Sequence, residues 1–151
     1  MQKLFLIFLV GILLQCESAP VIPTKRQNAG LNGHPIFVEL ELLPAKTTKH
    51  LNLKIKVENI SDQSIRDFSI LLFAKDKQTM ILVPETYKTP ELICHLPKLL
   101  RSGHAGVCPV LSFQYASDFD RIHINSISLT MEDGTRHFIT SEELEAIHEW
   151  K

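Results

Sequence analysis

Hydrophobic and polar side chains alternate along several short segments of this chain. The alternation is without a miss over 51–58, and it recurs over 37–43 until Pro44 ends the segment. Because successive side chains of a strand point to opposite faces, a period of two residues predicts strands with one buried face. The segment 68–74 is apolar at most positions, which predicts a strand in the middle of a sheet with a layer on each side.

The second half of the chain continues this pattern around one irregular stretch. Further strands are predicted over 80–83, 110–116, 121–131 and 136–139. The apolar phase of 121–131 switches near Asn125-Ser126, which predicts a bulge or a crossing between sheets. Asp133-Gly134 suits a tight hairpin turn. Prolines and glycines interrupt 85–106, which we expect to be a long loop.

The C-terminal segment has the pattern of a short helix. Thr140 and Glu143 mark the ends of a capping-box sequence, and the helix is predicted to continue through Trp150. Short strands separated by turn residues at regular spacing are typical of sandwiches. The chain is therefore predicted to be all-β, an immunoglobulin-like antiparallel β-sandwich of about seven strands with a short C-terminal helix.

The N-terminal segment has the order of a secretory signal peptide, with a basic start, an apolar run over 4–14 and small residues after it. The run is about half of the roughly 20 residues that a membrane-spanning helix needs, so we expect no anchor. Small side chains at Cys16 and Ser18 place cleavage after Ser18, which makes 1–18 the signal peptide. A bacterial lipoprotein attached at Cys16 is the alternative, but the bulky Gln15 stands where a small residue is expected.

The segment 19–33 contains prolines, glycines and the dibasic pair Lys25-Arg26. We interpret it as a flexible N-terminal arm or propeptide that precedes a β-sandwich domain over 34–151. The dibasic pair is either a processing site or two solvated charges in a loose arm. The sequence leaves both interpretations open.

Charge and motifs exclude several classes of function. The chain has 16 Lys and Arg residues against 17 Asp and Glu residues, a net charge of −1. Nothing therefore draws the protein electrostatically toward nucleic acid or an anionic membrane. The sequence has no nucleophile elbow, no His-Glu-x-x-His and no glycine-rich phosphate loop. We predict no catalytic residues, no metal and no cofactor.

Cys94 and Cys108 are the cysteines that remain once the signal peptide is removed. In an oxidising compartment a single disulfide accounts for both of them. A zinc site built from these two cysteines with His95 and His104 is the alternative, since thiolate and imidazole are zinc ligands. Their spacing matches no recognised ligand pair, and we predict the disulfide.

Two further kinds of residue are candidates for surface chemistry. Asn59-Ile60-Ser61 is the one N-glycosylation sequon of the sequence, and it follows a predicted strand, so we expect a glycan on Asn59 in a eukaryotic host. Aromatic rings outside a core can contact a ligand. The candidates are Phe37, Tyr87, Tyr115 and Trp150.

A resemblance to known families rests on strand and turn residues. The stretch Val57-Glu58-Asn59-Ile60-Ser61, then Ile65, Phe68 and Ile70, and later 111–116 resemble the layout of family-49 carbohydrate-binding modules and of plant tapetum-determinant-like secreted proteins. The resemblance implies a small secreted sandwich. For the first family it also implies carbohydrate binding, for which Tyr87, Tyr115 and Trp150 are the candidate stacking residues.

These observations favour a secreted, non-enzymatic binding or interaction domain. We expect its sheet faces and the 85–106 loop to contact an extracellular protein or glycan, because loops on a rigid scaffold commonly carry such contacts. A carbohydrate-binding module is one alternative. A secreted signal or effector protein released at Lys25-Arg26 is the other.

Overall fold

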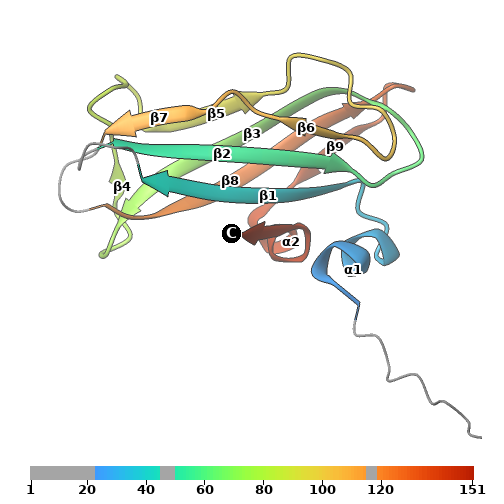
Figure 1. The fold of residues 1–151 in the computed structure, drawn as a ribbon, viewed down its shortest axis with the longest axis horizontal. Helices are drawn as coiled ribbons and strands as arrows, with labels where there is room; N and C mark the ends of the chain where they lie inside the picture. The colour runs from blue at the N-terminus through green and yellow to red at the C-terminus, as the bar shows by residue number, and fades with distance from the viewer. Residues whose placement is uncertain (1–22, 45–49, 115–118) are drawn as a thin grey trace, which may run out of the picture.

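The computed structural model of the protein describes residues 23–44, 50–114 and 119–151. The predicted signal peptide over 1–18, including Cys16, and the candidate contact residue Tyr115 lie outside these ranges. Strands predominate in the described chain, where they form two sheets accompanied by two short helices (Figure 1). The protein is therefore mainly β, as predicted. Neither helix in these ranges is long and apolar enough to cross a membrane.

Each sheet has five strands, and the two sheets share one hydrophobic core. Sheet A contains β1 (Ile36–Pro44), β2 (His50–Asn59), β6 (Ala105–Val107), β7 (Leu111–Gln114) and β10 (His148–Trp150). Sheet B contains β3 (Ile65–Asp76), β4 (Ile81–Leu82), β5 (Glu91–His95), β8 (Phe119–Met131) and β9 (Arg136–Ile139). The helices are α1 (Lys25–Leu31), which precedes β1, and α2 (Ser141–Ile147), which connects β9 to β10.

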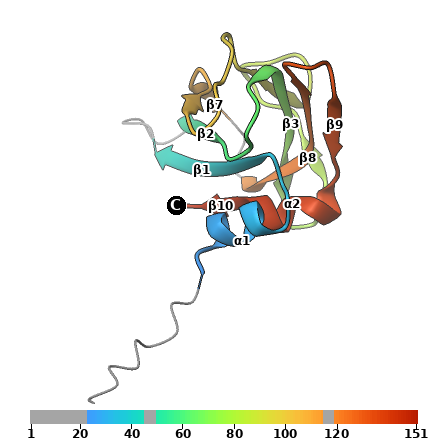
Figure 2. The ribbon, with the colours of Figure 1, turned by 90° about the vertical axis from the view of Figure 1, so that its right-hand side faces the viewer.

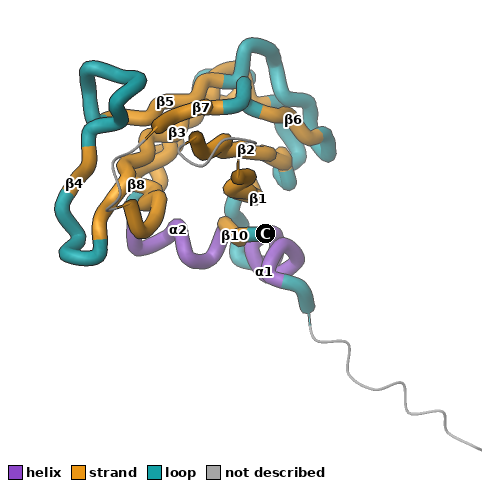
Figure 3. The backbone as a smooth tube through the Cα atoms, turned by 60° about the vertical axis from the view of Figure 1, so that its left-hand side comes forward, coloured by secondary structure: helices purple, strands orange, loops and turns teal. Residues whose placement is uncertain are grey.

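The strand order places the chain termini of the described region on one side of the molecule. In sheet A the order is β10-β1-β2, and β6 and β7 pair one after the other along the far edge of β2. In sheet B the order is β4-β3-β8-β9, with β5 also paired to β3. Figure 3 shows α2, β10 and α1 next to one another below β1, where the two helices close one side of the molecule.

The alternating pattern of β2 is confirmed by its burial. Leu53, Ile55 and Val57 are fully buried, whereas Lys54 between them is exposed.

The predicted irregularity in β8 is also confirmed. Leu71 of β3 pairs with Ser126 while the next residue, Leu72, pairs with Ile124, so that one residue of β8 is skipped. Such a bulge shifts the alternation by one position.

The prediction of a layer on each side of β3 was wrong. Figure 2 shows no further layer outside sheet B in the described part of the chain. Along β3, the core-facing Phe68, Ile70 and Leu72 are buried, and the outward-facing Ser69, Leu71 and Phe73 are half-buried. Neighbouring strands shelter the outer residues, since Leu71 pairs with Ile93 on one side and Ser126 on the other. Partial shelter within a sheet is therefore enough to explain this apolar pattern.

Helix α1 lies in the segment that the sequence predicts to be a flexible arm. The Thr24 side chain accepts a hydrogen bond from the Gln27 backbone, and the Gln27 side chain accepts one from the Thr24 backbone. This capping box satisfies backbone groups at the helix start. Ala29 of α1 is fully buried in the core. Residues 25–31 are thus part of the folded structure, which corrects the expectation of a loose arm there.

The C-terminal segment is helical only in part. Helix α2 ends at Ile147, and His148–Trp150 pairs with β1 in parallel, the one parallel pairing between described strands. The free edge of β1 offers backbone groups that need partners. Pairing with this edge replaces the last turn of the predicted helix, so the prediction of a helix through Trp150 was wrong.

The predicted disulfide is present, and it joins the two sheets. Cys94 lies in β5 of sheet B and Cys108 directly follows β6 of sheet A. Their Cα atoms are 6.0 Å apart, and each residue is 2% exposed. Because the two sulfur atoms are bonded to each other, neither is available as a thiolate ligand. This removes the zinc alternative in the oxidised protein.

Replacing both cysteines with alanine should lower the free energy of unfolding by about 3 kcal/mol, since the disulfide closes a loop of about 15 residues. Urea unfolding of the wild-type protein and of the Cys94→Ala, Cys108→Ala variant measures the difference. Wild-type protein treated with reductant should move toward the variant. Equal midpoints for the two proteins would show that the bridge contributes nothing to stability.

Candidate functional site

One end of the molecule gathers turns from both sheets together with α1. The β2–β3 turn (60–64), the β5–β6 loop (96–104) and the β8–β9 turn (132–135) meet there, at the right of Figure 1. We call this region the loop end. A groove opens on it between α1 and residues 59–61 and 102–103, and a second depression, the loop hollow, is formed by residues 96–107.

The side chain of Asn59 is the buried polar centre of the loop end. It is fully buried, and every polar atom of its carboxamide is hydrogen-bonded. Its Nδ2 donates to the carbonyl oxygens of Gln63 at 2.7 Å and Leu100 at 3.0 Å. Its Oδ1 accepts from the backbone N–H of Ser61 at 3.0 Å and from the Ser61 hydroxyl at 2.7 Å. The carboxamide therefore joins the β2–β3 turn to the β5–β6 loop.

Backbone hydrogen bonds extend this connection. The Asn59 N–H donates to the His104 carbonyl at 2.9 Å, and the Gly103 N–H donates to the Asn59 carbonyl at 3.0 Å. Ile65 and Leu100 exchange two backbone hydrogen bonds of 2.8 and 2.9 Å. Asn59 and Leu100 are 41 residues apart in the chain. The loop is thus held in place by contacts that are distant in sequence.

The burial of Asn59 corrects the expectation of a glycan at this residue. An N-linked glycan replaces one hydrogen of Nδ2 and must leave the protein surface next to that nitrogen. Here both hydrogens are donated to buried or half-buried carbonyl groups, and the residue has no exposed surface. A modified side chain would lose at least one of these bonds and disrupt the packing around it. In the folded protein, Asn59 acts as a structural residue.

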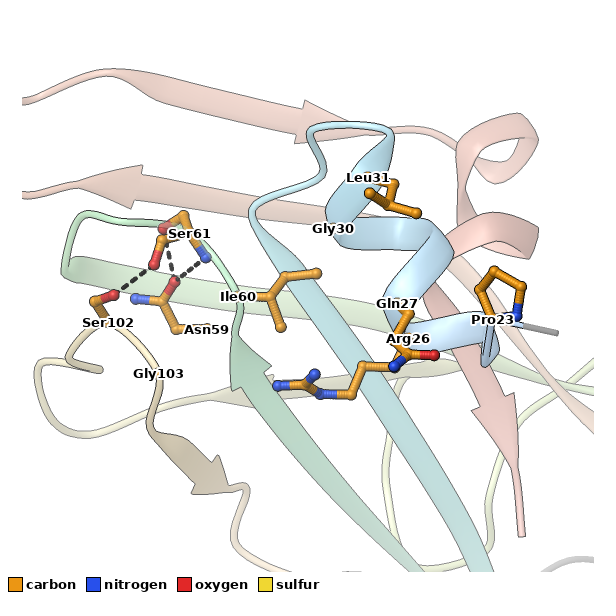
Figure 4. Close-up of a pocket in the computed structure, with 10 residues that line it drawn as sticks. All are labelled: Pro23, Arg26, Gln27, Gly30, Leu31, Asn59, Ile60, Ser61, Ser102 and Gly103. Atoms are coloured by element: carbon orange, nitrogen blue, oxygen red, sulfur yellow. Dashed lines mark hydrogen bonds between the residues drawn. The ribbon is translucent and has the colours of Figure 1, made fainter. Parts of the chain in front are cut away.

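The groove lies directly beside this network (Figure 4). It has a volume of about 670 Å³ and is open to solvent. The Ile60 side chain points from the turn toward α1, and Leu31 at the end of α1 is 78% exposed. On the opposite wall the Ser102 hydroxyl donates to the Ser61 carbonyl at 2.5 Å. The groove therefore combines apolar surface with fixed polar groups.

Arg26 of α1 spans one side of the groove to reach β2. Its guanidinium donates two hydrogen bonds to the Glu58 carboxylate, one of them at 2.7 Å from Nε, in a bidentate pair. The hydrogen bonds from Arg26 lower the pKa of Glu58, against an opposing effect of burial. Bidentate arginine–carboxylate pairs fix orientation as well as charge. The pair holds α1 against sheet A.

The outer face of sheet A carries its own ion pairs. Lys54 lies opposite Glu41, and Lys56 lies opposite Glu39, with Nζ–Oε2 distances of 3.5 and 3.1 Å. Lys151 also reaches Glu39 at 3.0 Å. Burial alone would raise the pKa of Glu39, but hydrogen bonds from the two lysines outweigh it and lower the pKa. The charges on this face are therefore matched within the face itself.

The three candidate aromatic residues in the described part of the chain, Phe37, Tyr87 and Trp150, do not lie together. Phe37 is 1% exposed and belongs to the core, because both faces of β1 are covered at this point, so its assignment as a surface contact was wrong. Tyr87 is 37% exposed and its hydroxyl donates to the Ser112 carbonyl at 3.3 Å, beside β7. Trp150 is 43% exposed in β10, at the opposite edge of sheet A. These rings do not form one stacking surface.

The dibasic pair occupies the first turn of α1. Lys25 and Arg26 are the first two residues of the helix, and Arg26 is bound to Glu58. Proteases bind their substrates as extended segments, so cleavage after Arg26 would require this helical turn to open. Processing at this pair stays one of the two interpretations that the sequence leaves open.

Histidines and acidic residues are dispersed in the structure. In the described ranges, no group of three or more His, Cys, Asp or Glu residues is arranged to hold a metal ion. The rings of His104 and His148 are hydrogen-bonded through Nδ1 to backbone carbonyls of Ser102 and Leu144. Burial and the neighbouring Lys75 and Arg121 charges lower the pKa of His123 in β8.

Sequence reasoning missed the contribution of α1 to the site. The signal was present, because Thr24 and Gln27 have the spacing of a capping box, in which Gln can replace Glu. Arg26 and Glu58 are 32 residues apart, and no local pattern pairs them. The stretch 85–106, predicted to be a long loop, contains strand β5, which pairs with β3 and in which Leu92 and Cys94 are buried, so this prediction was wrong in part.

Comparisons with known proteins leave the family of the chain undefined. No protein-family model and no curated protein matches it. Among solved structures, IrmA from Escherichia coli is similar over 77% of this chain and 92% of its own, with 10% identity and a TM-score of 0.47. A Northeast Structural Genomics Consortium target is similar over 70% of this chain and 79% of its own, with the same identity and TM-score.

A third similar structure is that of the GH20 exo-β-N-acetylglucosaminidase from Vibrio harveyi. It is similar over 78% of this chain at 18% identity, with a TM-score of 0.42. This chain covers only 18% of that enzyme's chain. At these levels of similarity, none of the three proteins assigns an activity to this chain.

Two substitutions in the sequon should separate structure from glycosylation. Asn59→Ala removes the four side-chain hydrogen bonds that join the β2–β3 turn to the β5–β6 loop, so it should cost at least about 2 kcal/mol of stability. Ser61→Ala destroys the sequon but keeps the carboxamide, and should cost about 1 kcal/mol. Urea unfolding measures both values.

The matching test of modification is the mass of protein from a eukaryotic secretory host. Wild type and Ser61→Ala should differ only by the mass of one oxygen atom, and peptide N-glycosidase should change neither. A glycan released from the folded wild-type protein would refute the structural role assigned to Asn59.

The Arg26–Glu58 pair should make stability depend on acid pH. Because the folded-state pKa of Glu58 lies below its ordinary value of 4.5, the pair contributes stability that is complete above about pH 5 and is lost as the pH falls through the folded-state pKa. Glu58→Gln and Arg26→Ala should each reduce this acid-dependent loss, and the double variant should add little to either. Urea unfolding between neutral and acid pH provides the comparison. Parallel pH profiles for wild type and Glu58→Gln would contradict the assignment.

Proposed function

We propose that this chain is a secreted, non-enzymatic binding domain with an immunoglobulin-like sandwich, and that it engages an extracellular protein or glycan at its loop end. The observation that carries the proposal is the groove of about 670 Å³ beside the Asn59 network. Its volume lies within the range typical of ligand sites, roughly 300–1,000 Å³. The buried disulfide is consistent with an oxidising extracellular compartment.

The rigidity of the groove walls supports a binding role. One wall is α1, held by the buried Ala29 and by the Arg26–Glu58 pair. The other wall consists of the turn and loop segments that the Asn59 carboxamide joins. A surface that is ordered before binding loses little conformational entropy when a partner docks.

The groove also combines exposed apolar surface with hydrogen-bonding groups, which suits binding of a partner. Leu31 and Ile60 present apolar surface, and Gln27 and Ser102 add hydrogen-bonding groups at the sides. The outer face of sheet A differs, since its charges are already paired with one another. The contact surface is therefore proposed at the loop end, and not on that sheet face.

Gly30 allows the groove to be blocked without damage to the core. It lies in α1 and lines the groove, and a Cβ atom there would come no closer than 3.9 Å to its nearest neighbour, Ile60. Gly30→Leu should therefore fold and fill part of the groove. Gly30→Ala is the matched control, which should gain about 0.5–1 kcal/mol from helix propensity and leave the groove open.

The test is capture of a partner from extracellular fluid by the oxidised, immobilised domain. A specific partner should be retained by wild type and Gly30→Ala and lost by Gly30→Leu. Capture by all three proteins would place the contact elsewhere and refute the groove. Enzymatic turnover that is abolished by a single His or Glu substitution would refute the non-enzymatic assignment.

A further inference from the structure

We infer that the loop hollow is a second binding site, separate from the groove, for a small aliphatic carboxylate. The hollow has a volume of about 310 Å³, near the lower end of the range for ligand sites. Its apolar surface comes from Leu96, Leu99, Leu100 and Val107. Among the described residues no acidic side chain lines it, whereas Lys98, Arg101 and His104 do.

The floor of the hollow depends on Gly106 in β6. A Cβ atom at this position would lie 3.2 and 3.3 Å from the methyl groups of Leu96 and 3.4 Å from a methyl group of Leu100. The two leucines therefore pack directly onto the backbone of the strand. Leu99 and Val107 are 46% and 50% exposed, so an apolar surface remains open to solvent beside this floor.

The cationic residues of the hollow differ from the lysines on the outer face of sheet A. In the described part of the chain, Lys54, Lys56 and Lys151 are each paired with a glutamate. Within those same ranges Lys98 and Arg101 have no ion pair, and both are exposed. An apolar depression with unmatched positive charge at its rim is complementary to a ligand that combines an aliphatic chain with one negative group.

The hollow is formed before any ligand binds. The Cys94–Cys108 disulfide closes the base of the 96–107 segment. Leu100 is held by two backbone bonds to Ile65 and by the Asn59 carboxamide. The His104 ring is held by an Nδ1–H hydrogen bond to the Ser102 carbonyl at 2.9 Å. Binding therefore requires ordering only the Lys98 and Arg101 side chains.

The size and charge of the hollow define the ligand class. A chain of several carbons fits against the leucines, and a carboxylate can accept a bidentate pair of hydrogen bonds from the Arg101 guanidinium. A neutral chain of the same length would use only the apolar floor. A cationic chain would be repelled by Lys98 and Arg101.

Sodium octanoate is the probe, with octanol and octylammonium as neutral and cationic analogues of equal chain length. Titration of the oxidised, ¹⁵N-labelled protein should shift the backbone amide signals of residues 96–107 with octanoate. Octanol should bind about tenfold more weakly, and octylammonium should cause no saturable shift. Equal binding of the three probes, or shifts centred on another part of the protein, would refute the inference.

Charge reversal at the rim of the loop hollow provides a second test of the octanoate site. Lys98→Glu with Arg101→Glu should weaken octanoate binding about tenfold or more without changing stability, since both side chains are exposed. Lys88→Glu, an exposed lysine outside the hollow, is the matched control and should leave binding unchanged. Equal losses in both variants would show a nonspecific charge effect and overturn the site. Gly30 lines the groove and not the hollow, so Gly30→Leu should leave octanoate binding unchanged. The octanoate site and the proposed groove are therefore tested independently of each other.

Discussion

The hydrogen bonding of one buried carboxamide organises the loop end of this protein. Asn59 lies where β2 leaves the core, and its buried side chain donates one hydrogen bond to a carbonyl group of the turn and one to a carbonyl group of the loop. A buried amide that lacked any of these partners would be costly, so the geometry of both segments is restricted to arrangements that satisfy it. The groove and the loop hollow are both lined by residues of the loop that this side chain holds.

The disulfide and the Asn59 network act on the same loop from different directions. Cys94 and Cys108 join the ends of the segment and connect the sheets, whereas Asn59 and Ile65 hold its middle. A crosslink at the base alone would leave a loop of this length free to sample many conformations. Contacts in the middle of the loop remove that freedom and turn an irregular segment into a defined surface.

Local patterns predicted what depends on near neighbours. The alternation of 51–58, the bulge near Asn125 and the pairing of the cysteines each follow from a few adjacent residues or from a count of thiols. Helix α1 was missed although its capping box is a local signal, but other errors concern distant contacts. Phe37 has the phase of an outward residue, and only the packing on the second face of β1 buries it. The sequence shows that Asn59 belongs to a sequon, but it does not show that the side chain is buried. That burial depends on a contact with Leu100, which is 41 residues away.

The net charge of this protein gives little information about its surface, because some regions of the described chain contain ion pairs and others contain charged side chains without a partner of opposite sign. The value of −1 arises from nearly equal numbers of acidic and basic residues. On sheet A these residues face each other across β1 and β2, so their fields largely cancel at short range. At the loop hollow, cations stand beside exposed leucine and valine side chains, and no acidic residue from the ranges that the structure describes lines the hollow. Local attraction for an anion can therefore exist on a protein that is nearly neutral overall, and the fold determines where it occurs.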